Sequence, residues 1–121
     1  MVAVVDDEEP VRRATERVLR AAGYRVALFS GGAAFLDCLD CQRPACVLVD
    51  GKMPDMDGRE VLSPLSGRAA RVPAIVVSGH DSAEDRRAAA ALGAVAFFSK
   101  PYDPEELLEA IAAAVAVTAT D

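Results

Sequence analysis

The sequence has 121 residues, a length that indicates a single domain, and a chain of this size buries roughly two-thirds of its unfolded surface. Hydrophobic residues make up 52% and charged residues 26%, so the composition is that of a globular protein and excludes a disordered segment. The net charge of −6 disfavours direct binding to nucleic acid or to an anionic membrane surface, because both attract basic patches.

The sequence also bears on localisation. The longest apolar stretch, residues 110–117, is too short to span a bilayer, and no basic segment precedes the first apolar run. Three cysteines without a disulfide framework indicate a reducing compartment, so we expect a cytoplasmic protein. Cys38 and Cys41 have the spacing of a redox or zinc pair. We favour two small apolar residues near a helix end, because zinc needs about four ligands and the single histidine, His80, lies in another connection.

Strand and helix patterns alternate along the chain. Short apolar runs bounded by turn formers predict strands, and apolar residues at helical spacing predict helices. In chain order the first six elements are a strand at 2–5, a helix at 10–22, a strand near a sheet edge at 25–29, a helix at 30–38, a buried strand at 46–50 and a short helix at 59–65. The last four are a strand at 74–77, a helix at 83–92, a strand at 95–98 and a helix from 103 onward.

Capping residues predict the helix bounds. Pro10 suits the first position of a helix, and Gly23 suits its end. Ser30 and Ser82 are expected N-caps, and Asp103 followed by a proline is a strong helix start. The residues expected to face inward are 11, 14, 18, 19 and 22 of the first helix, Phe35, Leu36 and Leu39 of the second, and Leu107, Leu108, Ile111 and Val115 of the last.

Five strands alternating with five helices predict an α/β fold, an open parallel sheet with helices on both faces. No repeat or internal boundary is visible, so residues 1–121 are expected to form one domain. In such sheets ligands bind at the carboxyl ends of the strands. The polar residues that this rule brings to one edge are Asp6, Asp7, Asp50, Ser78 and Lys100.

The chemistry of these side chains indicates phosphoryl transfer. Three aspartates within about 5 Å repel each other by roughly 3 kcal/mol per pair at an effective dielectric constant of about 20, and a hard cation such as Mg²⁺ relieves this. Lys100 adds a positive charge and Ser78 a hydroxyl donor, which together with a divalent ion suit the oxygens of a phosphoryl group. Asp50 is left as the nucleophile that forms an acyl phosphate. Taken singly, Asp7 is equally well a charge at a helix N-terminus and Lys100 a surface lysine.

Several motifs occur in the order and spacing of a known family. They are Asp6-Asp7-Glu8, Asp50 with Met53-Pro54-x-Met56-Asp57-Gly58, Ser78-Gly79 and Lys100-Pro101. Over residues 2–117 the chain resembles the receiver (response regulatory) domain of two-component response regulators. The resemblance implies a flavodoxin-like, doubly wound parallel sheet of order 2-1-3-4-5 with five helices. It also implies a phosphorelay in which Asp50 accepts phosphate from a sensor kinase histidine.

The same resemblance implies roles for single residues. Asp7 would bind Mg²⁺ (Mn²⁺ is an alternative) directly and Asp6 through water, and the backbone carbonyl of Lys52 would be a further protein ligand beside Asp50. Ser78 and Lys100 would hold phosphoryl oxygens.

Phe97 lies at the family's switch-aromatic position, three residues before Lys100. The resemblance implies that its ring turns inward as Ser78 moves toward the phosphate, and the alternative is a simple core phenylalanine. Two residues flank the expected phosphoryl site. We hypothesise that Lys52 obstructs the hydrolytic water and lengthens the phosphate lifetime, whereas His80 either positions water or faces solvent.

The resemblance further implies partners. They are a sensor histidine kinase or phosphotransfer protein, an output domain or effector protein, and a second copy through the fourth helix and fifth strand. Residues 77–81 are closest to receivers of helix-turn-helix transcriptional regulators. The chain is expected to be no conventional enzyme, with self-phosphorylation and autodephosphorylation only, and it is either stand-alone or part of a longer regulator or hybrid kinase.

The sequence disfavours three other functions. An interaction domain that keeps the fold without using phosphate is disfavoured by the intact acidic pair, acceptor and lysine. A metal-dependent phosphohydrolase is disfavoured because Asp50-Gly51-Lys52 lacks the second aspartate of an Asp-x-Asp motif. A dinucleotide-binding fold is excluded, since no Gly-x-Gly-x-x-Gly follows the first strand.

Overall fold

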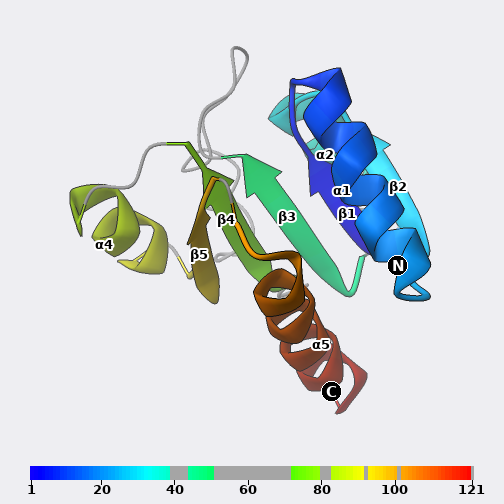
Figure 1. Ribbon diagram of the computed structural model, residues 1–121. Coiled ribbons are helices and arrows are strands. Elements are labelled where there is room, and N and C mark those ends of the chain that lie inside the picture. Colours follow the sequence, from blue (N-terminus) through cyan, green and yellow to red (C-terminus); the bar gives the residue numbers. More distant parts are fainter. Residues whose placement is uncertain (39–43, 51–71, 80–82, 92, 101, 121) are drawn as a thin grey trace.

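The structure, a computed structural model, describes residues 1–38, 44–50, 72–79, 83–91, 93–100 and 102–120. These ranges hold five strands and four helices (Figure 1). In chain order they are β1 (Val2–Val5), α1 (Glu9–Ala21), β2 (Val26–Phe29), α2 (Gly32–Cys38), β3 (Cys46–Asp50), β4 (Ala74–Ser78), α4 (Ala83–Ala91), β5 (Ala96–Ser99) and α5 (Pro104–Thr120). The helix predicted at 59–65 lies outside the described residues. No helix in the described part of the chain is long and apolar enough to cross a membrane.

The strands form one parallel sheet of order β2-β1-β3-β4-β5, which confirms the predicted flavodoxin-like topology. Every residue of β1, β3 and β4 is buried, whereas β2 and β5, at the two edges, are only partly buried. Covered central strands explain why their sequences are continuous apolar runs rather than alternating ones.

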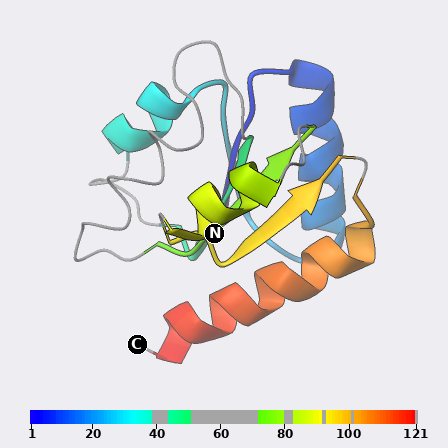
Figure 2. The same cartoon turned by 90° about the vertical axis from the view of Figure 1, so that its left-hand side faces the viewer.

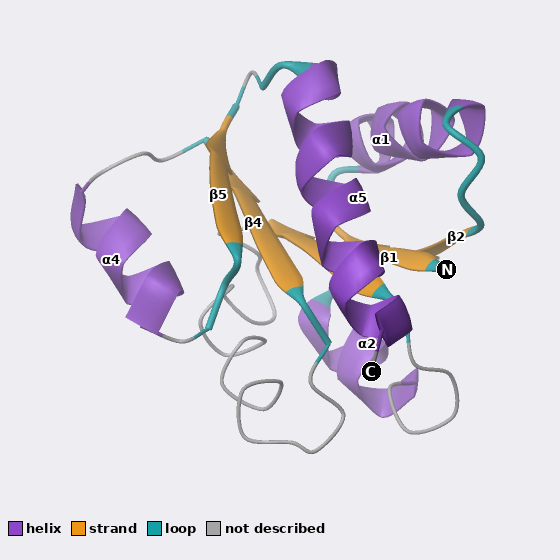
Figure 3. Ribbon diagram, turned by 90° about the horizontal axis from the view of Figure 1, so that it is seen from below, coloured by secondary structure: helices purple, strands orange, loops and turns teal. Residues whose placement is uncertain are grey.

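Helices cover both faces of the sheet. Alternate residues of a strand point to opposite sides, so each strand contributes to two cores. On one face Val2 and Val4 of β1 pack with Leu19 of α1 and with Leu107 and Ile111 of α5. On the other face the core includes Ala3 and Val5 of β1, Phe35 of α2 and Ala89 of α4. Figure 3 shows α1 and α5 together on one side of the strands with α4 on the other, and Figure 2 shows α5 running along the sheet to the C-terminus.

The first helix corrects one detail of the sequence prediction. Val11 and Val18 are half-buried and Leu19 is buried, as expected, but Ala14 and Ala22 are exposed. Thr15 takes the buried position instead, and its hydroxyl donates to the Val11 carbonyl at 3.0 Å. A threonine hydroxyl satisfied within its own helix can occupy an inward-facing position at little cost.

Helix ends follow the predicted chemistry in part. Gly23 and Gly93 have φ angles of 95° and 98°, which favour glycine. Gly23 lies just beyond the helix that it was predicted to end, and Gly93 lies beyond the end of α4. The Asp103 carboxylate accepts from the backbone N–H of Glu105 at 2.9 Å, which confirms the predicted cap of α5. Ser30 is not the cap of α2, because that helix begins at Gly32 and the preceding residue is Gly31.

Both edge strands begin one residue later than predicted. β2 begins at Val26 and β5 at Ala96, so Arg25 and Val95 lie outside them. The backbone N–H of Val95 donates to the Ala74 carbonyl at 2.9 Å, but its side chain is 59% exposed. Its hydrophobicity therefore does not reflect a place in the core. Ser82 and Leu39 lie outside the described residues.

Candidate functional site

Parallel pairing brings the predicted polar residues to one edge of the sheet. Asp6 directly follows β1, Asp50 ends β3, Ser78 ends β4, and Lys100 directly follows β5. The cross-strand partners align these ends in register; they are Val5 with Val49, Asp50 with Val77, and Ser78 with Ser99. The carboxyl-end rule thus correctly predicted that these residues lie at one edge of the sheet.

Four carboxylates meet at this edge. Asp6, Asp7, Glu8 and Asp50 each offer one oxygen, and these oxygens all lie within 4.8 Å of one another. Asp6 and Asp50 are 6% and 7% exposed, whereas Asp7 and Glu8 are exposed. At this separation two carboxylates repel by about 3 kcal/mol at an effective dielectric constant of roughly 20. The sequence argument did not assign Glu8 to the cluster, although its position beside the Asp6-Asp7 pair was the available signal.

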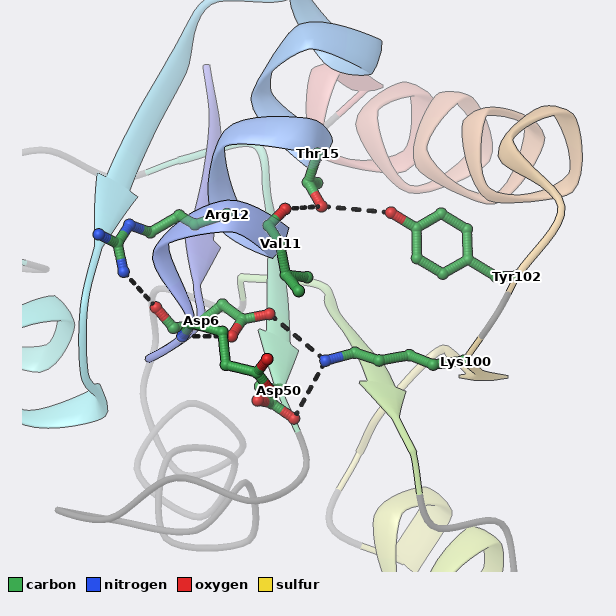
Figure 4. A network of polar contacts seen from close by, with 8 residues as sticks. Asp6, Val11, Arg12, Thr15, Asp50, Lys100 and Tyr102 are labelled. Atoms are coloured by element: carbon green, nitrogen blue, oxygen red, sulfur yellow. Dashed lines mark hydrogen bonds and ion pairs between the residues drawn. The ribbon is translucent and has the colours of Figure 1, made fainter.

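Lys100 supplies positive charge to the two buried carboxylates (Figure 4). Its Nζ atom lies 3.5 Å from Asp6 Oδ2 and 3.7 Å from Asp50 Oδ1. The lysine side chain is 22% exposed, so bulk water screens these pairs less than it screens a surface pair. Lys100 therefore holds the Asp6 and Asp50 carboxylates near one point. Its single positive charge does not balance four carboxylates, so the cluster keeps a net negative charge.

Backbone contacts fix where Asp6 and Lys100 lie. Asp6 Oδ1 accepts from the Glu8 N–H at 2.9 Å, and the Asp6 carbonyl accepts from Arg12 Nη1 at 2.8 Å. The Lys100 N–H donates to the carbonyl of Ser78 at 2.8 Å, which ties the lysine to the end of β4. Arg12 was not predicted as part of the site, and only its position in the first turns of α1 could have indicated it.

Ser78 itself is 4% exposed and lies at the end of β4, one residue beyond the partner of Asp50. The role of its hydroxyl in holding a phosphoryl group stays a prediction. Lys52 and His80, the two residues proposed to tune phosphate lifetime, lie outside the described residues, as does the Lys52 carbonyl expected to bind metal.

A second polar contact lies beside the carboxylates, between the hydroxyls of Thr15 and Tyr102. The hydroxyls of Thr15 in α1 and Tyr102 lie 3.2 Å apart (Figure 4), and both residues line a small cavity of about 20 Å³ together with Asp6, Asp50 and Lys100. Sequence reasoning missed this pair, because nothing local connects residues that are 87 positions apart. The contact links α1 to the segment that follows Lys100.

Phe97 lies in β5 opposite Val76 and is half-buried against the core on the α2 and α4 face. The guanidinium carbon of Arg86 in α4 lies 4.9 Å from the centroid of its ring. Phe97 therefore contacts both the core and the guanidinium of Arg86.

The cysteines stand apart from this chemistry. Cys38 is exposed at the end of α2, Cys46 is buried in β3, and Cys41 lies outside the described residues. Burial raises the pKa of the Cys46 thiol to about 12, so this residue is a protonated core side chain at neutral pH.

The donor set at the strand ends fits a hard divalent cation. All four clustered side chains offer carboxylate oxygens, two of them buried and two open to water. Mg²⁺ prefers oxygen ligands and keeps several waters, so exposed ligands beside buried ones suit it. A softer metal such as zinc would call for nitrogen or sulfur ligands, and the cluster has none.

Comparison with known proteins agrees with this geometry. A family model for the response regulator receiver domain matches residues 2–112. The response regulator protein TmoT of Ectopseudomonas mendocina is 35% identical over 115 residues, which are 95% of this chain and 52% of that protein. The transcriptional regulatory protein FixJ of Rhizobium meliloti is 36% identical over 110 residues, 91% of this chain and 54% of that protein. The chain spans about half the length of these curated relatives.

Solved structures show the same fold. The crystal structure of a response regulator receiver domain protein (CheY-like) from Methanospirillum hungatei JF-1 superposes with a TM-score of 0.90 at 28% identity. The superposition covers 98% of this chain and 95% of that chain. With the family model matching nearly the whole sequence, and with the strand order and acidic edge in place, the chain belongs to the response regulator receiver domain family.

Proposed function

We propose that this receiver domain accepts a phosphoryl group on Asp50 from a histidine of a sensor kinase or phosphotransfer protein. The observation that carries the proposal is the placement of Lys100 Nζ between the Asp6 and Asp50 carboxylates, at 3.5 and 3.7 Å, beside an acidic cluster open to water. An ammonium at this point can move from carboxylate to phosphoryl oxygen with little rearrangement.

The chemistry needs three things from the chain. An Asp50 carboxylate oxygen attacks phosphorus in line with the bond to the histidine nitrogen; a P–O bond forms, the P–N bond breaks, and the imidazole leaves with a proton from solvent. Lys100 and the Ser78 hydroxyl neutralise charge on the phosphoryl oxygens. Burial of Asp50 keeps its attacking oxygen free of most competing water.

Asp6, Asp7, Asp50 and the Lys52 carbonyl would hold Mg²⁺, with Mn²⁺ as an alternative. When bound, the ion offsets the repulsion between the carboxylates and the incoming phosphoryl group. Glu8, which lies within the same cluster, would serve the ion's water shell.

Signalling would pass through Ser78 and Phe97. Ser78 moving toward the phosphoryl group would vacate space at the end of β4, and the Phe97 ring, half-buried in neighbouring β5, would turn into it. Phosphate then shifts the populations of two conformations rather than creating a new one. With no hydroxyl on this ring, packing of β5 and α4 carries the signal.

In this proposal residues 1–121 form one cytoplasmic receiver domain, which catalyses only its own phosphorylation and dephosphorylation. Its partners would be the kinase or phosphotransfer protein, an output domain or effector protein, and a second copy through α4 and β5. FixJ, a transcriptional regulatory protein about twice as long as the matched segment, favours transcription as the output. The domain itself would bind neither nucleic acid nor membrane, in keeping with its charge of −6.

Intact-mass spectrometry after incubation with acetyl phosphate and Mg²⁺ tests the proposal. Wild-type protein should gain the mass of one phosphoryl group, and Asp50→Asn should fold and gain none. Asp37→Asn, an exposed aspartate of α2, is the matched control and should be labelled like wild type. If wild-type protein is not labelled while a known receiver is, the chain is an interaction domain that has kept the fold without the phosphate chemistry.

A further inference from the structure

One side chain of α4 reaches across to the edge strand. The Arg86 guanidinium lies over the Phe97 ring, with Cζ 4.9 Å from the ring centroid, and Arg86 Nη2 donates to the Ser99 hydroxyl at 3.3 Å. Phe97 and Ser99 are two residues apart on β5, so their side chains lie on the same face of the strand. Arg86 thus contacts β5 twice, through the ring of Phe97 and through the hydroxyl of Ser99.

The contacts of Arg86 matter because few residues of α4 are buried. Within Ala83–Ala91 the only buried residue is Ala89, whose side chain is a single methyl group. The adjacent Arg87 offers a contrast, since its Nε donates at 3.3 Å to the Ala83 carbonyl of its own helix. Two neighbouring arginines therefore have different contacts: Arg86 contacts β5, whereas the hydrogen bond of Arg87 stays within α4.

Phe97 and Ser99 lie at the end of β5 that is nearest the site. Ser99 is the cross-strand partner of Ser78, and the next residue, Lys100, carries the ammonium that lies between Asp6 and Asp50. A contact that fixes Ser99 and the Phe97 ring therefore acts on the strand end from which the site lysine extends.

We propose that Arg86 is a positioning residue that holds Phe97 and the end of β5 in the unphosphorylated arrangement. This inference rests on the proposed phosphorylation of Asp50 and on a movable Phe97 ring. A ring that turns toward the core leaves the guanidinium, so the cation–π contact stabilises only the starting conformation. An exposed contact of this kind changes the ratio of two conformations by about two- to five-fold. Arg86 therefore modestly disfavours the change from the unphosphorylated to the phosphorylated conformation.

The first test needs no phosphate. In NMR spectra of the unphosphorylated protein, the ring current of Phe97 should displace the Arg86 side-chain resonances from those of Arg87. With fluorinated phenylalanine incorporated and the Phe97 signal assigned by Phe97→Leu, Arg86→Ala should shift that signal and Arg87→Ala should leave it in place. An unchanged signal in Arg86→Ala, or equal shifts in both variants, overturns the inference.

The second test measures phosphorylation by acetyl phosphate with Mg²⁺. Arg86→Ala should be labelled about two- to five-fold faster than wild type, and Arg87→Ala, with the same change in net charge, at the wild-type rate. In a Phe97→Leu background, Arg86→Ala should have a smaller effect, because only the hydrogen bond to Ser99 is then lost. Equal acceleration by both arginine variants would show a general charge effect and refute the role of Arg86. If no variant, wild type included, is labelled, the proposed function fails, and the fluorine signal alone decides the contact's role.

Discussion

Replacing Lys100 by methionine should destabilise the fold markedly when Mg²⁺ is absent. The substitution keeps most of the aliphatic stem and removes the charge that lies 3.5 Å from Asp6 and 3.7 Å from Asp50. Removing one partner of a buried ion pair costs about 3 to 5 kcal/mol, because it leaves an uncompensated buried charge. Since the lysine side chain is 22% exposed and water can reach the cluster, we expect a loss of about 2 to 3 kcal/mol.

Urea denaturation followed by circular dichroism measures this loss. Arg13→Met is the matched control, since Arg13 Nε lies closer to its partner, 2.9 Å from Glu9 Oε1, but the two side chains are 64% and 59% exposed. That exposed pair should contribute less than about 1 kcal/mol. Burial rather than distance thus decides which substitution costs more.

Mg²⁺ should reduce the stability that Lys100→Met loses. In Lys100→Met the cluster lacks its nearest positive charge, so added Mg²⁺ should raise the free energy of unfolding more than it does in wild-type protein. The electrostatic account of the site is wrong if Arg13→Met costs as much as Lys100→Met, or if Mg²⁺ stabilises both proteins equally.

Four further outcomes are expected. Lys52→Asn should lose its phosphate faster than wild type in a dephosphorylation assay, and an unchanged or slower rate would remove Lys52 from control of the hydrolytic water. Because burial raises the pKa of Cys46 from 9.0 to about 12, its thiol should resist alkylation in folded protein at mild alkaline pH, while exposed Cys38 reacts. The raised pKa also contributes stability that is fully present below about pH 9 and is lost as the pH rises toward 12, because the thiol of the unfolded chain ionises first. The free energy of unfolding should therefore show this contribution to its fall with pH in wild type and lack it in Cys46→Ala. Asp103→Ala should lower the free energy of unfolding by about 1 kcal/mol through loss of the α5 cap, whereas the exposed Asp37→Ala should change it little, and equal losses would count against the cap.

The convergence of the polar residues at one edge of the sheet could be predicted from the sequence because it depends only on where each strand ends. Short apolar runs that end in Asp6, Asp50 and Ser78 need only be parallel for those side chains to share an edge. The errors arose where tertiary packing overrides local pattern. Ala14 was apolar and at helical spacing yet is exposed, and Val95 continued an apolar run yet lies outside β5.

The sequence by itself thus determined the strands, the parallel topology and the gathering of carboxylates and lysine at one edge, because apolar runs and the helices that alternate with them are visible in the local pattern. The tertiary structure decided which of those groups touch. Only packing places Lys100 Nζ against both Asp6 and Asp50, the Thr15 hydroxyl against Tyr102, and Arg86 over the ring of Phe97. Such contacts join residues distant in the chain, and they depend on how helices settle on the sheet rather than on any local propensity.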